Sequence, residues 1–501
     1  MMLNTRTLLS FALAAAFLIG ATPTAQSEDK TAPKEAAKGL LRLLPADVTS
    51  ERSINFDGKR FAYRVVAGTL PIFATSGDQK AAIFYTAYTL PNADHARRPL
   101  TFVFNGGPGA ASAFLHLGLA GPRIADFGPS GREGAAATLR DNPETWLAFT
   151  DLVFVDPIGT GWSRTDKFDD AKEYWSVNAD AQVMAKTIAL YVAHNARGAS
   201  PKYLLGESYG GFRAAKVARV LQQDQGIVAS GIVMLSPLLE SGYTFGGDRL
   251  SLGCALQLPS IVAAELESKH ALTLDKLADA ERFAMTDYLT TLAGAPPKGD
   301  AARVFYGRIA EMTGLPADIV EKARGCVRDA YLNHRRDRTR QSLSAYDASF
   351  GVDDPFPDSD RRRTPDPVLD GFVRALGGLF ADYARNELGF KTDMTYSLLA
   401  GDVGGSWDWG RGGRSGGQGV SDDIRELLSL NPSFRLLVAH GNADLITPHM
   451  VSRYVLDHIP QIGGPERVQL KVYSGGHMFY LADPSRVAFS GDARAFFQRA
   501  E

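Results

Sequence analysis

The feature that most constrains the fold is a short apolar strand that turns directly into a helix around a serine. The strand is expected over Tyr203–Leu205, the turn reads Gly206-Glu207-Ser208-Tyr209-Gly210, and a helix-forming run (FRAAKVARVLQQ) follows. A G-x-S-x-G turn in this position forces the serine into a strained, exposed conformation, and glycines on both sides make room for it. Alone, the pentapeptide could occur by chance in a chain with 50 glycines. Its strand–turn–helix context predicts a nucleophile elbow with Ser208 as the nucleophile.

Further apolar and β-branched runs predict strands on both sides of this elbow. They lie at Arg60–Val66, Ala82–Leu90, Leu100–Phe104, Leu152–Val155, Gly231–Leu235, Phe434–Ala439 and Val468–Tyr473. A helix is expected over Trp175–Asn195 between two of them. Strands that alternate with helices predict an α/β fold with a mostly parallel central sheet flanked by helices.

Residues 238–431 interrupt this alternation and are interpreted as an inserted, largely helical cap over the active edge of the sheet. Residues 28–237 and 432–501 would then form the two parts of the core. Within the insertion we expect helix from Pro259 to about Tyr331 and over Val368–Glu387. The basic cluster 334–340 is expected to be a solvated loop because acidic residues interrupt it. A Gly-rich loop, 401–419, carries Trp407 and Trp409.

The N-terminus has the pattern of a signal peptide. Arg6 precedes the apolar run Leu8–Gly20, and Ala25-Gln26-Ser27 is an acceptable cleavage site, so residues 1–27 are expected to be removed. An uncleaved membrane anchor is the less favoured alternative, because a polar, Pro-containing stretch follows at once. The mature protein is therefore expected to be secreted or periplasmic, without a membrane span. Export allows a disulfide between Cys254 and Cys326, although two buried free thiols are equally compatible with the sequence.

The charge balance excludes some classes of partner. The net charge is −2, which gives no bulk attraction to nucleic acid or anionic lipid. The nine histidines are scattered and no Cys/His pair has zinc-site spacing, so neither a metal nor another cofactor is predicted.

A serine nucleophile needs a base, and the base needs an orienting acid. In the order Ser, acid, His, the late candidates are Asp444 after FRLLVA and His477 after VQLKVY, each in a loop at the carboxyl end of a strand. Asp444 could instead be a turn or helix-capping residue, and His477 a structural histidine. His440 lies too near Asp444, and His449 follows Pro448 as in a first helical turn. Gly475-Gly476 free the backbone before His477, which is therefore the preferred base.

An oxyanion hole needs two backbone N–H donors. One is expected from Tyr209, directly after the nucleophile. The other is expected from the loop Asn105-Gly106-Gly107-Pro108-Gly109 after the strand LTFVF, with Gly107 as the candidate donor. A Gly/Pro turn without a catalytic task is the alternative.

Five separated blocks resemble the serine carboxypeptidase family. They read FNGGPGAAS (104–112), LVFVDPIGTGWS (152–163), LLGESYGG (204–211), LLVAHGNADLITP (436–448) and SGGHMFY (474–480). The segment SWDW (406–409) is similar to bacterial members. The resemblance implies an α/β-hydrolase fold with an inserted cap and metal-free removal of C-terminal residues from peptides. It also implies a triad of Ser208, Asp444 and His477.

The resemblance further implies that Asn105, Gly106 and Glu207 bind the terminal carboxylate of the substrate. A glutamate can hydrogen-bond a carboxylate only if one of the two is protonated, so activity should favour acid pH. His477 must stay neutral to act as base, which opposes that trend.

The chain departs from the family pattern at three places. Ala110 and Thr447 stand where many members carry cysteine, and the position of a second glutamate falls at Leu119 or Ala120. The last departure weakens carboxylate recognition. A serine esterase or acyltransferase with the same triad is therefore an alternative to a carboxypeptidase, and a non-catalytic binding protein is a less favoured one. The oligomeric state stays open.

Overall fold

A sheet of ten strands lies at the centre of the computed structural model, which describes residues 38–56, 58–245, 250–358 and 365–498. The predicted signal peptide, 1–27, lies outside these residues. The strands are β1 (Val48–Phe56), β2 (Lys59–Phe73), β3 (Gln79–Thr89), β4 (Leu100–Phe104), β7 (Asp151–Val155), β8 (Arg164–Thr165), β9 (Lys202–Glu207), β10 (Gly231–Leu235), β13 (Arg435–Gly441) and β14 (Val468–Tyr473).

The strand order is β1-β2-β3-β7-β4-β9-β10-β13-β14, with β8 paired to β3. The run from β7 to β14 is parallel, whereas β1, β2 and β3 are antiparallel additions at one edge. The prediction of a mostly parallel sheet is confirmed. The edge strand β1 was missed because its polar and charged residues (VTSERSINF) give no apolar run.

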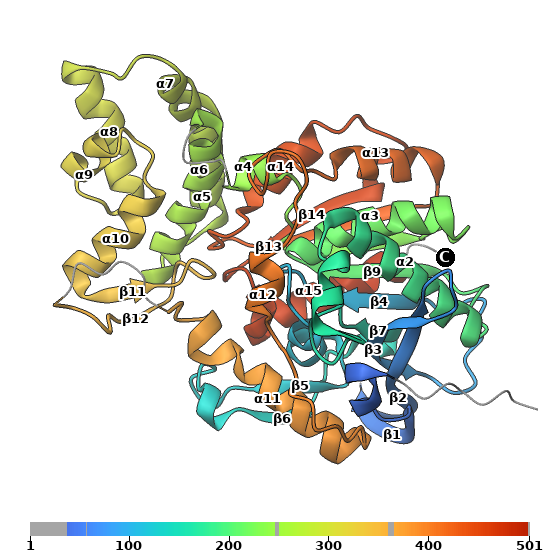
Figure 1. Ribbon diagram of the computed structural model, residues 1–501. Helices are drawn as coiled ribbons and strands as arrows, with labels where there is room; N and C mark the ends of the chain where they lie inside the picture. The colour runs from blue at the N-terminus through green and yellow to red at the C-terminus, as the bar shows by residue number, and fades with distance from the viewer. Residues whose placement is uncertain (1–37, 57, 246–249, 359–364, 499–501) are drawn as a thin grey trace, which may run out of the picture. The chain divides into compact units, whose positions relative to one another are not determined.

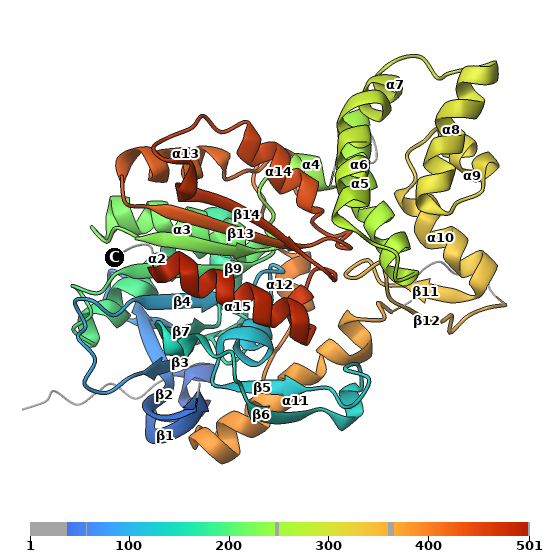
Figure 2. The same ribbon diagram turned by 180° about the vertical axis from the view of Figure 1, so that it is seen from behind.

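Helices cover both faces of the sheet (Figures 1 and 2). One core contains Leu204 together with residues of α2 (Val177–His194), α3 (Tyr209–Asp224) and α13 (Ser421–Leu430). The other contains Leu205 together with residues of α11 (Ala375–Asp382) and α15 (Asp483–Gln498). Successive strand residues point to opposite faces, so each parallel strand must be apolar on both sides. This explains the unbroken apolar runs in the sequence.

The predicted insertion divides into two kinds of segment. Six helices have a separate apolar core: α5 (Ser251–Ser268), α6 (Leu274–Phe283), α7 (Leu289–Ala293), α8 (Gly299–Thr313), α9 (Ala317–Lys322) and α10 (Arg328–Thr339). We call these the helical group. The hairpin β11 (Gln341–Leu343) and β12 (Gly351–Asp353) follows it. Residues from 368 onward, including α11 and α13, pack instead into the two cores of the sheet.

A disulfide joins the first helix of the helical group to the segment between α9 and α10. Cys254 and Cys326 have Cα atoms 5.4 Å apart, and Cys254 is buried. The chain therefore uses the disulfide, one of the two states that the sequence left open.

Two local predictions in the helical group are wrong. Helix α5 begins at Ser251 and contains Pro259, because burial of its neighbours Leu258 and Ile261 stabilises the helix despite the hydrogen bond that proline cannot donate. The basic cluster is helical up to Thr339 rather than a loop. Its charges are neutralised there by carboxylates, since Arg335 pairs with Glu265 and Arg336 with Asp354.

The close packing at the elbow predicts the effect of one added methyl group. In Gly206→Ala, the new Cβ would lie 2.0 Å from the carbonyl oxygen of Gly210, which is backbone and cannot rotate away. We expect the free energy of unfolding to fall by about 1–3 kcal/mol or more. Urea denaturation measures this. Gly198→Ala is the matched control, because nothing lies within 4 Å of its added Cβ. Equal stability of both variants would contradict the packing described.

Candidate active site

Ser208 occupies a strained turn between β9 and α3. Its backbone has φ 60° and ψ −125°, a conformation that costs a non-glycine residue about 1–3 kcal/mol. Its N–H donates to the carbonyl of Leu235 at 2.8 Å, and its carbonyl accepts from Gly211 at 3.0 Å. A Cβ at Gly210 would lie 2.6 Å from the carbonyl oxygen of Phe104, so glycine is required where α3 passes β4. The surroundings thus hold the serine at the helix entrance.

The acid and base candidates are brought together beside this turn. Nδ1 of His477 lies 2.8 Å from Oδ2 of Asp444, and both side chains are buried. Asp444 follows β13 and His477 follows β14, the next strands beyond β10. Ser208 and His477 line the same pocket, of about 80 Å³. The pocket thus has a serine and a histidine in its wall, and a carboxylate lies behind the histidine.

Charge adjusts the pKa values of this group. Burial alone would lower the pKa of His477, but the charge and hydrogen bond of Asp444 and the charge of Glu207 raise it above its ordinary value. Burial would raise the pKa of Asp444, but the charge and hydrogen bond of His477 hold it below its ordinary value. The pair therefore stabilises an imidazolium, which is what a histidine that accepts a serine proton must become.

The competing histidines are occupied elsewhere. Nε2 of His440 lies 2.8 Å from Oγ of Ser452, and burial lowers its pKa to about 3. Nε2 of His449 lies 2.8 Å from Oε1 of Glu281, and His449 begins α14 (His449–Asp457), as its position after a proline predicted. Neither lines the pocket of Ser208.

Thr447, which stands where many members of the resembling family carry cysteine, contacts both Asp444 and His477. Its hydroxyl lies 2.8 Å from Oδ2 of Asp444 and 3.1 Å from Nδ1 of His477. The backbone N–H groups of Ile446 and Thr447 also donate to Oδ1 of Asp444. An aspartate followed three residues later by threonine is a turn signature that could have indicated this arrangement.

The loop that carries His477 is held by the insertion. The N–H of His477 donates to the carbonyl of Tyr346, whose ring lies edge-on to the imidazole with centroids 5.4 Å apart. A Cβ at Gly476 would lie 2.0 Å from the same carbonyl oxygen, which explains the glycine. The hydroxyl of Ser236 donates to the carbonyl of His477 at 2.8 Å. The base is thus fixed from two sides.

The predicted oxyanion-hole residues also meet at the elbow. The backbone of Gly106 approaches the N atom of Tyr209 so closely that an added Cβ would lie 2.5 Å from it. Tyr209 is the first residue of α3, so its N–H has no acceptor within the helix. Gly107 has φ +95° and lines the same pocket. Arg213, which no sequence motif indicated, bonds the carbonyl of Asn105 and pairs with Asp180.

Glu207 lines the same pocket, accepts two hydrogen bonds on Oε2, and has Oε1 4.0 Å from Nε2 of His477. Nδ2 of Asn105 donates to Oε2 of Glu207 at 3.2 Å, and the hydroxyl of Tyr480 donates to the same oxygen. Burial raises the pKa of Glu207, against the opposing charge of His477 and these hydrogen bonds. Leu119 and Ala120, where a second glutamate was sought, are buried in an apolar core. The partner of Glu207 is thus the phenol of Tyr480, a residue at the end of the SGGHMFY block.

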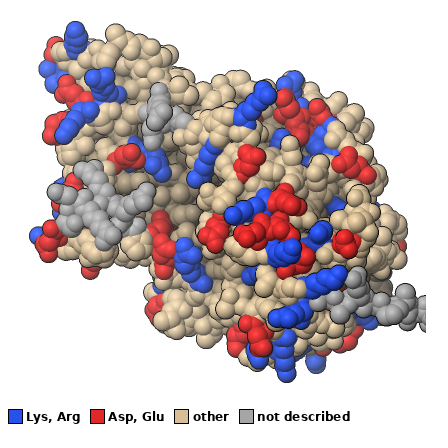
Figure 3. All heavy atoms as spheres, viewed as in Figure 1, with Lys and Arg blue, Asp and Glu red and all other residues tan. Residues whose placement is uncertain are grey.

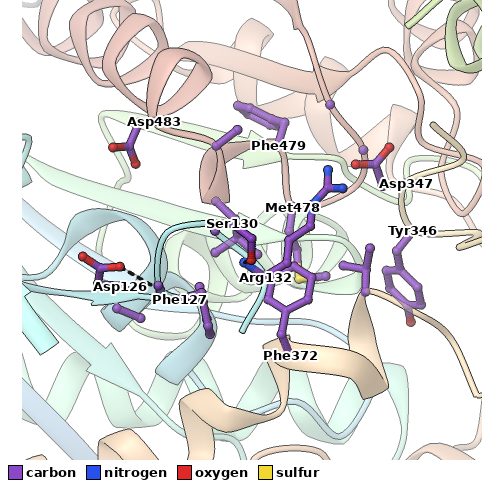
Figure 4. A pocket seen from close by; sticks show the side chains of 18 of the residues that line it. Asp126, Phe127, Ser130, Arg132, Tyr346, Asp347, Phe372, Met478, Phe479 and Asp483 are labelled. Atoms are coloured by element: carbon purple, nitrogen blue, oxygen red, sulfur yellow. Dashed lines mark hydrogen bonds between the residues drawn. The ribbon is translucent and has the colours of Figure 1, made fainter. Parts of the chain in front are cut away.

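A larger cavity, of about 500 Å³, adjoins this pocket and shares Tyr346 and Met478 with it. Figure 4 shows its lining: Phe127 from the region after β5 (Arg123–Asp126), Phe372 from the insertion, and Met478 from the segment after His477. The side chain of Arg132 also reaches into it. The cavity gives the nucleophile's pocket an extension on the side of Met478.

Other kinds of site find no support in the described residues. No three His, Cys, Asp or Glu side chains gather there in a way that could hold a metal ion. Among the helices of these residues, none combines the length and apolarity needed to cross a bilayer. Acidic and basic side chains are interspersed on the face shown in Figure 3.

A match to a known protein family includes Ser208 and its neighbours but not the acid and base candidates. A family model for serine carboxypeptidases matches residues 63–235. The matched segment contains Ser208, Glu207 and the Asn105–Gly107 loop, and it ends before Asp444 and His477. Serine carboxypeptidase-like 44 of Arabidopsis thaliana is 30% identical over 163 residues, 32% of this chain. The match spans 31% of that curated relative's length.

The fold is shared with a solved carboxypeptidase. The crystal structure of Kex1(Δ)p, a prohormone-processing carboxypeptidase from Saccharomyces cerevisiae, superposes with a TM-score of 0.57 at 15% identity. The superposition covers 87% of this chain and 91% of that one. The prediction of an α/β-hydrolase fold is confirmed. The family match over the elbow supports the prediction of an enzyme, a hydrolase of the serine carboxypeptidase type.

The charge of Glu207 makes a testable contribution to the base. Because that charge raises the pKa of His477, Glu207→Gln should lower it, and more of the imidazole should then be neutral in acid. The acid limb of kcat/KM for an uncharged ester should therefore move to lower pH. Glu321→Gln, on the exposed surface of α9, is the control. An acid limb that stays in place or moves to higher pH would show that Glu207 does not act on the base.

Proposed function

We propose that this protein is a secreted or periplasmic serine carboxypeptidase that hydrolyses the C-terminal peptide bond of peptides. The observation that carries the proposal is one pocket lined by Ser208, His477, Glu207 and Asn105. It combines an activated serine with groups able to bind a carboxylate. The family match over residues 63–235 supports the same reaction.

In the proposed first step, Oγ of Ser208 attacks the carbonyl carbon of the last peptide bond. His477 accepts the serine proton on Nε2, while Asp444 fixes its tautomer through Nδ1. The N–H groups of Tyr209 and Gly107 stabilise the oxygen as it becomes negative. His477 then gives the proton to the departing amine, which leaves an acyl group on Ser208.

Water completes the proposed cycle. His477 removes a proton from water, the resulting hydroxide attacks the acyl carbon, and the proton returns to Ser208. No metal or cofactor takes part. The cavity on the side of Met478 provides room for the released residue or for its side chain.

Recognition of the terminal carboxylate is proposed to involve Asn105, Gly106 and Glu207. A protonated Glu207 can donate to a carboxylate, whereas an ionised one repels it. Burial raises the pKa of Glu207, which extends the protonated form toward milder acid. Activity on peptides should therefore fall as pH rises through that pKa.

We also propose that the protein is exported and that it is similar to bacterial members of the family. The N-terminal apolar run supports export, and the disulfide between Cys254 and Cys326 is compatible with an oxidising compartment. The SWDW segment supports a place among the bacterial members of the family. Its Trp407 and Trp409 rings pack edge-on against Tyr209, at 5.2 and 5.4 Å between centroids.

A serine esterase or acyltransferase is the second candidate. The observation that favours it is the replacement of a second carboxyl partner for Glu207 by the phenol of Tyr480. A carboxyl pair would share a proton and favour a bound carboxylate more strongly than a phenol does.

A substrate panel tests the proposed function. Purified protein is incubated with a blocked dipeptide, its C-terminal amide and a simple ester between about pH 4 and pH 8. Cleavage of the free-acid peptide in preference to its amide, strongest at low pH, is expected. Ser208→Ala should lower turnover by about 10⁴-fold or more.

Ser76→Ala, in the exposed turn before β3, serves as the matched control and should retain full activity. Turnover of the ester without cleavage of either peptide would instead assign the second candidate. Full activity of Ser208→Ala would contradict both.

A further inference from the structure

Arg414 lies in the same pocket as the nucleophile. It belongs to the Gly-rich loop between Trp409 and α13, and it lines the pocket together with Ser208 and His477. Its guanidinium carbon is 3.8 Å from the ring centroid of Phe245 and 5.9 Å from that of Trp409. These rings hold the guanidinium at the wall of the pocket that Ser208 and His477 also line.

The position of Arg414 is tied to the elbow through these aromatic neighbours. The ring of Trp409 lies 5.4 Å from that of Tyr209, the residue directly after the nucleophile, and 6.5 Å from that of Phe245. The backbone N–H of Asp408 donates to the carbonyl of Trp175 at 2.9 Å, which anchors the chain just before the loop. The aromatic residues that contact Arg414 are therefore themselves held in place by packing and by a backbone hydrogen bond.

Arg414 has no carboxylate partner in the part of the chain that the structure describes. Among the described residues, no ion pair or hydrogen bond to an acidic side chain is found for it, and Tyr346 is the titratable group that acts on it. The side chain is exposed as a whole, and the partial burial of its guanidinium lowers its pKa. Two other arginines near the site differ, because Arg213 pairs with Asp180 and Arg132 faces Asp347.

We propose that Arg414 binds a carboxylate group of the peptide substrate, as a permanent cation beside Ser208. This inference rests on the proposed peptidase function. A guanidinium offers planar paired donors that match a carboxylate, and it remains charged across the pH range of enzyme activity. Arg414 would provide a second carboxylate-binding group, in place of the second glutamate that is absent at Leu119 or Ala120.

The carboxylate has two possible sources. One is the C-terminus of the peptide, and the other is an acidic side chain on the acyl side of the scissile bond. Both present the same group to a guanidinium, and matched substrates separate them.

Arg414 and Glu207 differ in how they respond to pH. Glu207, which faces His477, Asp444, Tyr480 and Asn105, can hold a carboxylate only while protonated. Arg414 keeps its positive charge after Glu207 has ionised. Binding of a carboxylate near neutral pH should therefore depend on Arg414, and binding in acid should depend on it less.

The test compares Arg414→Gln and Arg414→Lys with the unchanged protein. Arg411→Gln is the matched control, since Arg411 is exposed on the same loop and does not line the pocket. One substrate pair is a blocked dipeptide and its C-terminal amide. The other is a peptide amide with Glu or Gln on the acyl side of the scissile bond. kcat/KM is measured for each at about pH 5 and about pH 7.

The preference is the ratio of kcat/KM for the carboxylate substrate to that for its neutral partner. For Arg414→Gln we expect this ratio to fall about 10-fold or more in one pair at about pH 7. At about pH 5 we expect a smaller fall. Arg414→Lys should restore part of the ratio, and Arg411→Gln should change nothing. Loss of preference in the first pair identifies the terminal carboxylate, and loss in the second identifies an acidic side chain. Equal losses for all four substrates, or none, would overturn the inference.

A failure of the proposed function would look different. The unchanged protein would then cleave none of the peptides while it still hydrolysed an ester. In that case turnover is measured for two esters that differ only in a carboxylate on the acyl side. Arg414→Gln should reduce turnover of the charged ester alone, and an unchanged ratio between the two esters would overturn the inference.

Discussion

The strained backbone at Ser208 is the constraint on which the rest of the site depends. A non-glycine residue with φ 60° is strained, so this turn persists only because the contacts around it stabilise it. Its N–H and carbonyl are both bonded, and Gly206 and Gly210 let α3 pass against β9 and β4 without a Cβ between them. The same turn exposes the hydroxyl and places the N–H of Tyr209 at the helix entrance. The proposed nucleophile and one proposed oxyanion donor therefore come from a single backbone feature.

The segment interpreted as an insertion contributes contacts to the site. Ala443 and Leu445, on either side of Asp444, pack into the core of the helical group. Tyr346, which follows that group, accepts a hydrogen bond from the N–H of His477. Acid and base are thus held from the insertion side, whereas the serine is held by the sheet. The orientation of His477 toward Ser208 depends on contact between these two parts of the chain.

Much of the fold could be predicted because parallel strands buried on both faces leave continuous apolar runs. The strands β4 and β10, buried along their whole length, coincide with their predicted ranges. The edge strand β14 also does so, although its residues are only half-buried and its apolar residues alternate with polar ones. The edge strand β1 and the helical basic cluster could not be recognised, since their charges are compensated by partners distant in sequence. Asp444 and His477 were candidates because they follow strands. Thr447, Tyr480 and Arg213 were missed, because each acts through a contact that only the folded chain creates.

The central claim is that Ser208 is a nucleophile activated by His477 and Asp444. Labelling with an organophosphonate that reacts only with activated serines, followed by mass spectrometry of the digested protein, tests it most directly. The account predicts one covalent adduct, on the peptide that contains Ser208, and its loss in His477→Ala with the fold retained. An adduct on another serine, or undiminished labelling without His477, would contradict the account.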